Sequence, residues 1–495
     1  MQKSGGSFRE RLQRLEVDRS VLYAISSRGW QFLAGPLTVW LIAKFFSADM
    51  QGFFYTFGSV LAMQLFFELG LATVLVNLVS HEWASLSLTD EGTVEGDAEA
   101  GCRLAALTST TGRWYGICAA LFVVGTGPAG VWLFSEKESS VDWQAPWWTV
   151  VVICAFAMQY IPKIATLEAC GQVRTVNQNR LFQAVTGSVV VWLAICLDFG
   201  LWTCVASAAV RLFWEVVLVE IRFGSLFRSL KRFRPAPESF SISGRGDEVA
   251  GDDTASGDDT ASGGDTAPGE GQVPPRADFD WWTEAWPLQW RIAIQSVALW
   301  FANYAFTPVI WKYHSEADAG RMGMTMQIVT AIQAAAIAWL QTRVPTLGHL
   351  AAKRDFVQFD RLFRRIAVNT TVFTVVGGAG LLGVLALLDH YEHRLADRLL
   401  PVLPTALLLL GVSVHHVVIC QGVYVRAQKQ DPFLKLATTV YLLIGAAVWF
   451  FGKHYNAEGV AAAWLAITAL IHLPLNTVVW WKYRCDRASM SSAPE

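Results

Sequence analysis

Apolar stretches of about twenty residues, separated by short charged segments, recur along nearly the whole chain. A helix needs roughly 20 largely apolar residues to span a bilayer. Only 16% of the 495 residues are charged and 53% are hydrophobic, whereas a soluble domain carries about 25% charged residues. Each charged side chain at the centre of a bilayer costs roughly 2.5–3.5 kcal/mol. The pattern therefore predicts an all-α integral membrane protein.

The lengths of these stretches predict about twelve transmembrane helices. We expect them near 21–46, 52–78, 114–135, 147–169, 180–198, 202–222, 285–311, 322–343, 366–388, 402–424, 434–451 and 459–481. With the N-terminus in the cytoplasm, 28 of the 39 Lys and Arg residues fall in cytoplasmic segments, seven on the opposite face and four inside spans. Cytoplasmic loops carry an excess of these residues. Both termini are therefore expected in the cytoplasm, as in a multi-pass protein of the bacterial inner (plasma) membrane.

A polar segment divides the twelve spans six and six. Residues 235–280 are rich in Pro, Gly, Ser and Asp and contain GDDTAS, GDDTAS and GGDTAP in tandem. Too few apolar residues are present to offset the entropy cost of ordering, so disorder is predicted. Calcium binding by the Asp pairs is the alternative, but EF-hand spacing is absent. The expected organisation is an amphipathic cytoplasmic N-terminus (1–20), a first half (21–223), a cytoplasmic linker (224–284), a second half (285–482) and a cytoplasmic tail (483–495).

An internal repeat relates the two halves. KFFSADMQG, from Lys44 to Gly52, recurs as KYHSEADAG, from Lys312 to Gly320. Each copy falls at the outer turn between the first and second spans of its half, and each first span carries a proline where a kink is expected. Two pseudo-symmetric six-helix bundles around a central cavity are therefore predicted.

Two arginines lie at similar depth near the cytoplasmic ends of the first spans. Arg28 and Arg291 could face the cavity and hold one anionic group, because a guanidinium fork suits a diphosphate. The alternative is that each extends toward the membrane interface. Lys163, beside Pro162, could join them or lie elsewhere.

Other polar residues inside spans are candidates for coupling or for the cavity lining. Glu68 could pair with an arginine or take part in proton coupling, and Arg211 with Glu215 is expected to form an ion pair at i,i+4 spacing. His415 is a second coupling candidate, although the sequence favours a hydrogen-bonded core histidine. Its neighbour His416 must point about 100° away on a helix. Three further residues could line the cavity or form interhelical hydrogen bonds: Gln295, Asn303 and Gln327.

Several chemistries are disfavoured by what the sequence lacks. No GxxxxGK[ST] motif, CxxC pair or zinc-spaced Cys/His cluster occurs. No cofactor, metal or nucleic acid is therefore expected. The predicted outer connections are short, so a membrane glycosyltransferase or polymerase with a large outer loop is disfavoured, and the chain is not expected to be an enzyme.

Four segments resemble a known superfamily of transporters. They are FFSADMQGFFYTFGSVLAMQLFFELGLATVL (45–75), WPLQWRIAIQ (286–295), EADAGRMGMTMQIVTAI (316–332) and VPTLGHLAAKRDFVQFDRLFRR (344–365). With Gly52 followed by Glu68-Leu69-Gly70, they resemble the multidrug/oligosaccharidyl-lipid/polysaccharide flippase superfamily, and most closely its polysaccharide-biosynthesis branch of Wzx-type O-antigen flippases. The resemblance covers nearly the whole chain outside 235–280.

The resemblance implies a fold and a function. It implies two six-helix bundles with alternating access, and outward flipping of an undecaprenyl-diphosphate-linked oligosaccharide. The cationic cavity residues that the resemblance implies are Arg28, Arg291, Lys163 and Arg211. The expected partners are this lipid-linked oligosaccharide and membrane lipids, with cytoplasmic glycosyltransferases as a further candidate at the linker. A cation-coupled drug or metabolite antiporter of the same superfamily is the alternative function, and a transport-inactive scaffold is a third.

Overall fold

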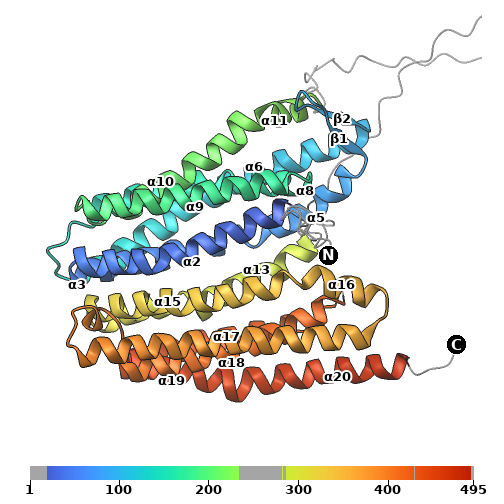
Figure 1. Cartoon of the computed structure of the whole chain (residues 1–495). Coiled ribbons are helices and arrows are strands. Elements are labelled where there is room, and N and C mark those ends of the chain that lie inside the picture. The colour runs from blue at the N-terminus through green and yellow to red at the C-terminus, as the bar shows by residue number, and fades with distance from the viewer. Residues whose placement is uncertain (1–18, 234–280, 282–285, 429, 492–495) are drawn as a thin grey trace, which may run out of the picture.

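The computed structural model of the chain describes residues 19–233, 281, 286–428 and 430–491. The expectations for an amphipathic N-terminal segment and for disorder at 235–280 fall outside these residues. Two bundles of helices lie side by side, and helices far apart in sequence run roughly along one common direction (Figure 1).

The first bundle contains most of the first 233 residues. Its helical elements are α2 (Arg19–Phe45), α3 (Ala48–Leu61), α4 (Gln64–Glu68), α5 (Leu71–Trp83), α6 (Ala98–Ser135), α7 (Gln144–Met158), α8 (Ile161–Ala169), α9 (Val173–Cys196), α10 (Trp202–Val216), the π-helical turn η1 (Val217–Arg222), α11 (Gly224–Leu230) and η2 (Lys231–Phe233).

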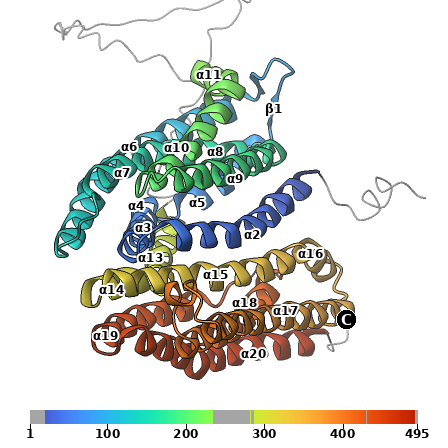
Figure 2. The same ribbon diagram turned by 60° about the vertical axis from the view of Figure 1, so that its left-hand side comes forward.

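The second bundle follows the residues that are not described. Its elements are α13 (Trp286–Asn303), α14 (Phe306–Tyr313), α15 (Glu316–Gln341), α16 (Val344–Ala352), α17 (Phe356–His390), η3 (Ala396–Arg398), α18 (Val402–Arg426), α19 (Leu434–Ile467), η4 (Thr468–His472) and α20 (Leu473–Ser491). Figure 2 shows α2, α3 and α13 between the outer helices of the two bundles.

Each of the twelve predicted spans coincides with a helix or with a helix interrupted at a break. Among the described residues, seven helices are long and apolar enough to cross a membrane, and two bent helix pairs raise the number to nine. The other predicted spans correspond to α2, to α10 with η1, and to the part of α19 beyond Asn456 together with η4 and the start of α20. Asn456 has a φ of 59°, which interrupts α19 at the predicted outer turn.

Two breaks inside spans have local causes. Helices α13 and α14 meet at 52°, just before Pro308, whose ring cannot continue the hydrogen bonding of the preceding turn. The α3–α4 segment and α5 meet at 44°, at Leu69 and Gly70, which both have positive φ. Pro36, by contrast, lies inside α2, which is one helix from Arg19 to Phe45, so the kink expected there is not accompanied by a break.

The hydrophobic core distinguishes the two ends of the molecule. At one end, here called the seam end (left in Figure 1), buried side chains of both bundles form shared clusters, for example Phe53 with Trp311 and Ile42 with Met324. Toward the other end, here called the linker end, each bundle has its own cluster: one contains Leu75 and the other Phe359. The bundles are therefore joined most extensively at the seam end.

A short hairpin and helix α11 cover the first bundle at the linker end. Strands β1 (Leu86–Leu88) and β2 (Val94–Gly96) form an antiparallel hairpin between α5 and α6, and the Val94 amide donates to Ser229 Oγ of α11 at 3.0 Å. Leu226 and Leu230 of α11 are buried against this bundle. Because their apolar residues recur at helical spacing, residues 224–233 fold onto the first bundle. The linker was expected from the sequence to begin at residue 224.

Candidate functional site

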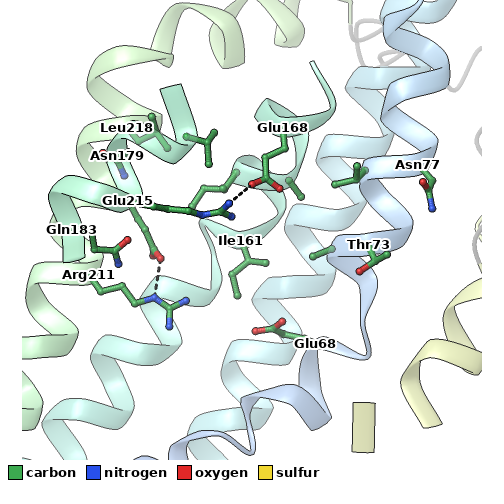
Figure 3. Close-up of a pocket in the computed structure, with 16 residues that line it drawn as sticks. Glu68, Thr73, Asn77, Ile161, Glu168, Asn179, Gln183, Arg211, Glu215 and Leu218 are labelled. Atoms are coloured by element: carbon green, nitrogen blue, oxygen red, sulfur yellow. Dashed lines mark hydrogen bonds and ion pairs between the residues drawn. The ribbon is translucent and has the colours of Figure 1, made fainter. Parts of the chain in front are cut away.

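A polar pocket of about 500 Å³ lies inside the first bundle (Figure 3). Four helical segments form it, each through residues spaced three or four apart, which places them on one helix face. The lining residues are Glu68, Ala72, Thr73, Val76 and Asn77 before and along α5; Ile161, Ile164, Ala165 and Glu168 of α8; Val176, Asn179, Arg180 and Gln183 of α9; and Arg211, Glu215 and Leu218 of α10 and η1.

Two ion pairs neutralise most of the charge in this pocket. Arg211 Nε lies 2.9 Å from Glu215 Oε1, the pair that the i,i+4 spacing predicts. Arg180 Nη1 lies 2.7 Å from Glu168 Oε1, which links α9 to α8. Glu68 is the third carboxylate among the lining residues and leaves one negative charge in excess. Its side chain points into the pocket from the side opposite Arg211 (Figure 3).

The uncompensated carboxylate in this pocket could bind a small cation or a proton. The Glu215 side chain is 7% exposed, and its Oε2 has no hydrogen-bond partner among the described residues. Glu68 accepts a hydrogen bond from Gln64 Nε2. A buried carboxylate oxygen without a donor is energetically costly. A proton or a cation bound to Glu215 Oε2 would remove that cost.

The two arginines predicted to hold an anion lie on helices of different bundles. Arg28 is part of α2, and its side chain is outside the described part of the structure. Arg291 lies on α13 with an exposed side chain, and its guanidinium carbon is 5.7 Å from the ring centroid of Trp290. Their joint action on one ligand remains a prediction.

Lys163 does not line the same pocket as Arg211. Its Nζ lies 2.7 Å from Glu220 Oε1 and within 5.1 Å of the Tyr160 ring centroid. It points from the other face of α8 into a separate pocket. Charge and depth in the sequence could not distinguish these two faces.

The three predicted polar lining residues have different positions. Gln327 Oε1 accepts a hydrogen bond from Tyr55 Oη at 2.7 Å across the two bundles. This is the interhelical hydrogen bond that the sequence analysis offered as the alternative to cavity lining. Asn303 is exposed and donates to the Leu299 carbonyl of its own helix. Gln295 is half-buried on α13.

Both neighbouring histidines are engaged in the second bundle. His415 Nδ1 lies 3.2 Å from Gln333 Nε2, and its ring centroid is 5.7 Å from that of His472. His416 is fully buried, with Nε2 2.9 Å from Thr370 Oγ1. The two rings have different partners, as their angular separation on a helix requires. Within the described ranges, no group of three His, Cys, Asp or Glu residues could hold a metal ion.

The internal repeat forms the centre of the seam. Ser47 and Ser315 are the N-caps of α3 and α15, and each hydroxyl accepts from the backbone amide three residues later, at 3.1 Å. Gly52 and Gly320 then bring the two backbones together. A Cβ on Gly320 would lie 2.9 Å from the Gly52 amide nitrogen, and a Cβ on Gly52 would lie 2.8 Å from the Glu316 carbonyl carbon.

Polar contacts surround this backbone crossing. Gln51 Nε2 donates to the Arg398 carbonyl at 3.0 Å, and Arg398 Nη2 donates to the Phe46 carbonyl at 2.8 Å. Lys312, from the second copy of the repeat, forms an ion pair with Glu136 of the first bundle. These contacts close the seam end with groups from both bundles.

Several residues of the polar pocket were not identified as site residues from the sequence. The sequence showed only that each of these residues is charged or polar. They are Asn77, Glu168, Asn179, Arg180 and Gln183. A usable signal was present in α9, where Val176, Asn179, Arg180 and Gln183 follow i, i+3, i+4, i+7 spacing. Which other helix faces meet that face depends on tertiary packing.

The comparisons with solved structures cover nearly the whole chain. The lipid II flippase MurJ in an inward closed conformation matches with a TM-score of 0.62 and 13% identity, covering 96% of this chain and 94% of that one. The inward-facing conformation of a multidrug resistance MATE family transporter of the MOP superfamily matches with a TM-score of 0.58 and 10% identity, covering 96% and 100%. A MATE transporter of Vibrio cholerae matches with a TM-score of 0.53 and 10% identity, covering 97% of each chain. No protein-family model matches the chain, and no curated protein sequence matches it either.

Proposed function

We propose that this chain, which has the fold of multidrug/oligosaccharidyl-lipid/polysaccharide (MOP) flippase superfamily transporters, flips a polyprenyl-diphosphate-linked oligosaccharide across a bacterial inner membrane. The linker end faces the cytoplasm, as the Lys and Arg distribution indicates. The polar headgroup enters between the bundles from this side and leaves at the seam end. The oligosaccharide is a precursor of a cell-surface polysaccharide.

The distribution of the hydrophobic core carries the proposal of alternating access. Both bundles share buried clusters at the seam end, whereas toward the linker end each bundle has its own. Separation of the bundles at the seam end would leave the two clusters toward the linker end intact, so each bundle could move as a unit. The described state is closed at the seam end, and export requires a second state in which the contact between Gly52 and Gly320 opens.

The preference for a lipid diphosphate rests on the two arginines at the first spans of the two bundles. Arg28 and Arg291 lie on α2 and α13, the helices that begin each bundle at the linker end. In the proposal, one ligand between the bundles binds to these two residues. A diphosphate offers acceptors to two guanidinium groups at once. The flippase among the structural neighbours is named for lipid II, a lipid-linked substrate.

Coupling to an ion gradient is assigned to the polar pocket of the first bundle. Glu68 and Glu215 offer carboxylate oxygens inside the predicted membrane region, with one negative charge in excess. A proton or cation that binds there changes the charge of one bundle only. That difference could favour one arrangement of the bundles over the other.

A cation-coupled drug or metabolite antiporter is the second candidate, and the same pocket favours it. Excess negative charge in the first bundle suits an organic cation as well as a proton. Multidrug MATE transporters are among the structural neighbours. In this case the arginines are not part of the substrate site.

Reconstitution into liposomes separates the two candidates. We expect the wild-type protein to move a fluorescent polyprenyl-diphosphate oligosaccharide between leaflets, measured by loss of access to a membrane-impermeant quencher. The double variant Arg28→Gln/Arg291→Gln should flip it at least about tenfold more slowly, because two charge-assisted hydrogen bonds contribute roughly 1.5–3 kcal/mol each.

A matched control uses another arginine of the same predicted face. Arg174 is exposed at the start of α9, and Arg174→Gln should flip the lipid at the wild-type rate. An unchanged rate in the double variant would remove the arginines from the substrate site. Uptake of a cationic dye by the wild-type protein, with no movement of the lipid, would establish the antiporter instead.

A further inference from the structure

A second pocket, of about 400 Å³, opens beside the first bundle at the linker end. It lies between α6, the junction of α7 and α8, and the η1–α11 segment. Its polar lining residues include Thr108, Thr111, Gln159, Lys163, Arg228 and Lys231. The proposed transport path does not use it.

Helix α8 forms a wall between this pocket and the polar pocket of Figure 3. Ile161, Ile164 and Glu168 face the polar pocket, while Pro162 and Lys163 face the second pocket. A ligand in one pocket therefore does not occupy the other.

The second pocket has an excess of positive charge. Lys163, Arg228 and Lys231 line it together with a single carboxylate, Glu220. Lys163 Nζ is paired with Glu220 Oε1 at 2.7 Å, and both side chains are partly exposed at 39% and 50%. Arg228 and Lys231 therefore supply two positive charges that this carboxylate does not balance.

The uncharged donors around the pocket are already engaged, so an anion is the ligand that fits the remaining groups best. Thr108 and Thr111 donate their hydroxyl protons to backbone carbonyls one turn earlier in α6, and Gln159 donates to the Tyr115 carbonyl. Arg228 Nε donates to the Gly224 carbonyl at 3.1 Å, which fixes the guanidinium near the pocket. The cationic groups are therefore the principal donors for a ligand.

The pocket continues a lipid-facing surface. Val152 and Phe156 of α7 are exposed apolar side chains, and Gln159 and Lys163 follow them at spacings of three and four, on the same side of the α7–α8 span. Ile221, beside Glu220, is 75% exposed. Exposed apolar residues at this level are expected to contact lipid chains, so a lipid could reach the pocket with its headgroup.

We propose that this pocket binds the phosphate of an anionic phospholipid of the cytoplasmic leaflet. Basic pockets between transmembrane helices on the cytoplasmic side are suited to acidic headgroups. Arg228 and Lys231 contact the phosphate, Lys163 shares its charge between the phosphate and Glu220, and the acyl chains lie along α7. The site is separate from the substrate path, and it holds whether the substrate is a lipid or a drug.

Lipid titration in nanodiscs tests the site. The full-length protein is placed in phosphatidylcholine nanodiscs with increasing fractions of phosphatidylglycerol, and the thermal unfolding midpoint is recorded. We expect the midpoint to rise and saturate. In Arg228→Ala/Lys231→Ala, half-saturation should need about 30-fold more phosphatidylglycerol, since each cation near an anionic surface contributes roughly a fivefold effect.

Two further variants make the test specific. Glu220→Gln removes the competing carboxylate and should lower the half-saturating fraction about fivefold. Arg222→Ala/Arg232→Ala removes two exposed cations of the same segment that are not among the pocket lining residues. This control should retain most of the wild-type response.

The outcomes distinguish a pocket from a general surface effect. An equal loss in both double variants would overturn the proposal, because it would reflect surface charge alone. Absence of any response to phosphatidylglycerol would overturn it as well. Equal stabilisation by inorganic phosphate in pure phosphatidylcholine nanodiscs would overturn the lipid assignment and identify a soluble phosphate ligand.

Discussion

Glu68 sits at the end of α4, directly before two residues with left-handed backbone conformation, Leu69 and Gly70. A Cβ on Gly70 would collide with Ile292 of the second bundle, so a glycine is needed at this break. The break between α4 and α5 thus fixes where the carboxylate enters the polar pocket. It also places the charged residue next to the contact between the bundles, where a change of protonation can affect their packing.

Replacement of Glu68 tests its role in coupling. Glu68→Gln keeps the size of the side chain but cannot release or take up a proton at this position. In proteoliposomes, we expect the stimulation of transport by an imposed pH gradient to fall about 100-fold, the lower end of the loss on removal of a proton-transfer group. Movement of the substrate across the membrane without an imposed pH gradient should continue.

Glu95, exposed on strand β2, provides the control for this experiment. Glu95→Gln should respond to the gradient as the wild-type protein does. Full gradient stimulation of the Glu68→Gln protein would assign coupling to another group, with His415 as the next candidate from the sequence.

At the scale of elements, the α3–α15 crossing depends on the absence of side chains. Gly52→Ala would place a Cβ 2.8 Å from the Glu316 carbonyl carbon, and overpacking of this kind costs roughly 1–3 kcal/mol. Only the state closed at the seam end carries this cost, so the open state should become about tenfold more populated. We expect faster labelling of Thr56→Cys, in a cysteine-free background, by a membrane-impermeant maleimide added outside.

Gly58, on the same helix α3, is the matched control. A Cβ there would meet no heavy atom within 4 Å in the described part of the chain. Gly58→Ala should leave the labelling rate of Thr56→Cys unchanged. Slow labelling in Gly52→Ala, equal to that of the control, would contradict the gate assigned to this crossing.

The elements differ in how well the sequence predicts them. The spans were predicted correctly because a bilayer demands a fixed length of apolar residues. The hairpin β1–β2 and helix α11 were not predicted, because short segments stabilised by tertiary contacts such as Val94 to Ser229 carry little local signal. The repeat predicted the location of a symmetric turn, but not that Gly52 and Gly320 touch each other.

At the scale of the whole molecule, the proposed alternating access requires the two bundles to move relative to each other. Tyr55 and Gln327 lie in different bundles, and their side chains are hydrogen-bonded at the seam. We expect a short thiol-reactive cross-linker between Tyr55→Cys and Gln327→Cys to stop transport in proteoliposomes, with recovery of the rate on cleavage of the linker. The uncross-linked double variant provides the reference rate.

A cross-link within one bundle is the control. Ser87 and Glu95 face each other across the hairpin, so linking Ser87→Cys to Glu95→Cys leaves the bundles free to move. Transport should continue there. Persistent transport with the seam cross-linked would contradict opening of the seam during transport.

Prediction of the candidate site from sequence was weaker than prediction of the fold. Hydropathy and charge identified Arg211 and Glu68 as unusual, and the structure places both in one pocket. The same reasoning grouped Lys163 with the other cations, although it lies on the opposite face of α8. Depth in a membrane is encoded along the sequence, whereas the direction in which a helix face points is fixed by its neighbours.

The backbone contact between Gly52 and Gly320 also bears on leakage. A membrane that stores energy as an ion gradient loses that energy through any continuous file of water molecules. Where two helices meet backbone to backbone, with Gly320 so near Gly52 that even a methyl group does not fit, no water molecule can pass between them. In the proposed transport cycle, this crossing would keep the seam end closed to water while the headgroup binds from the linker end.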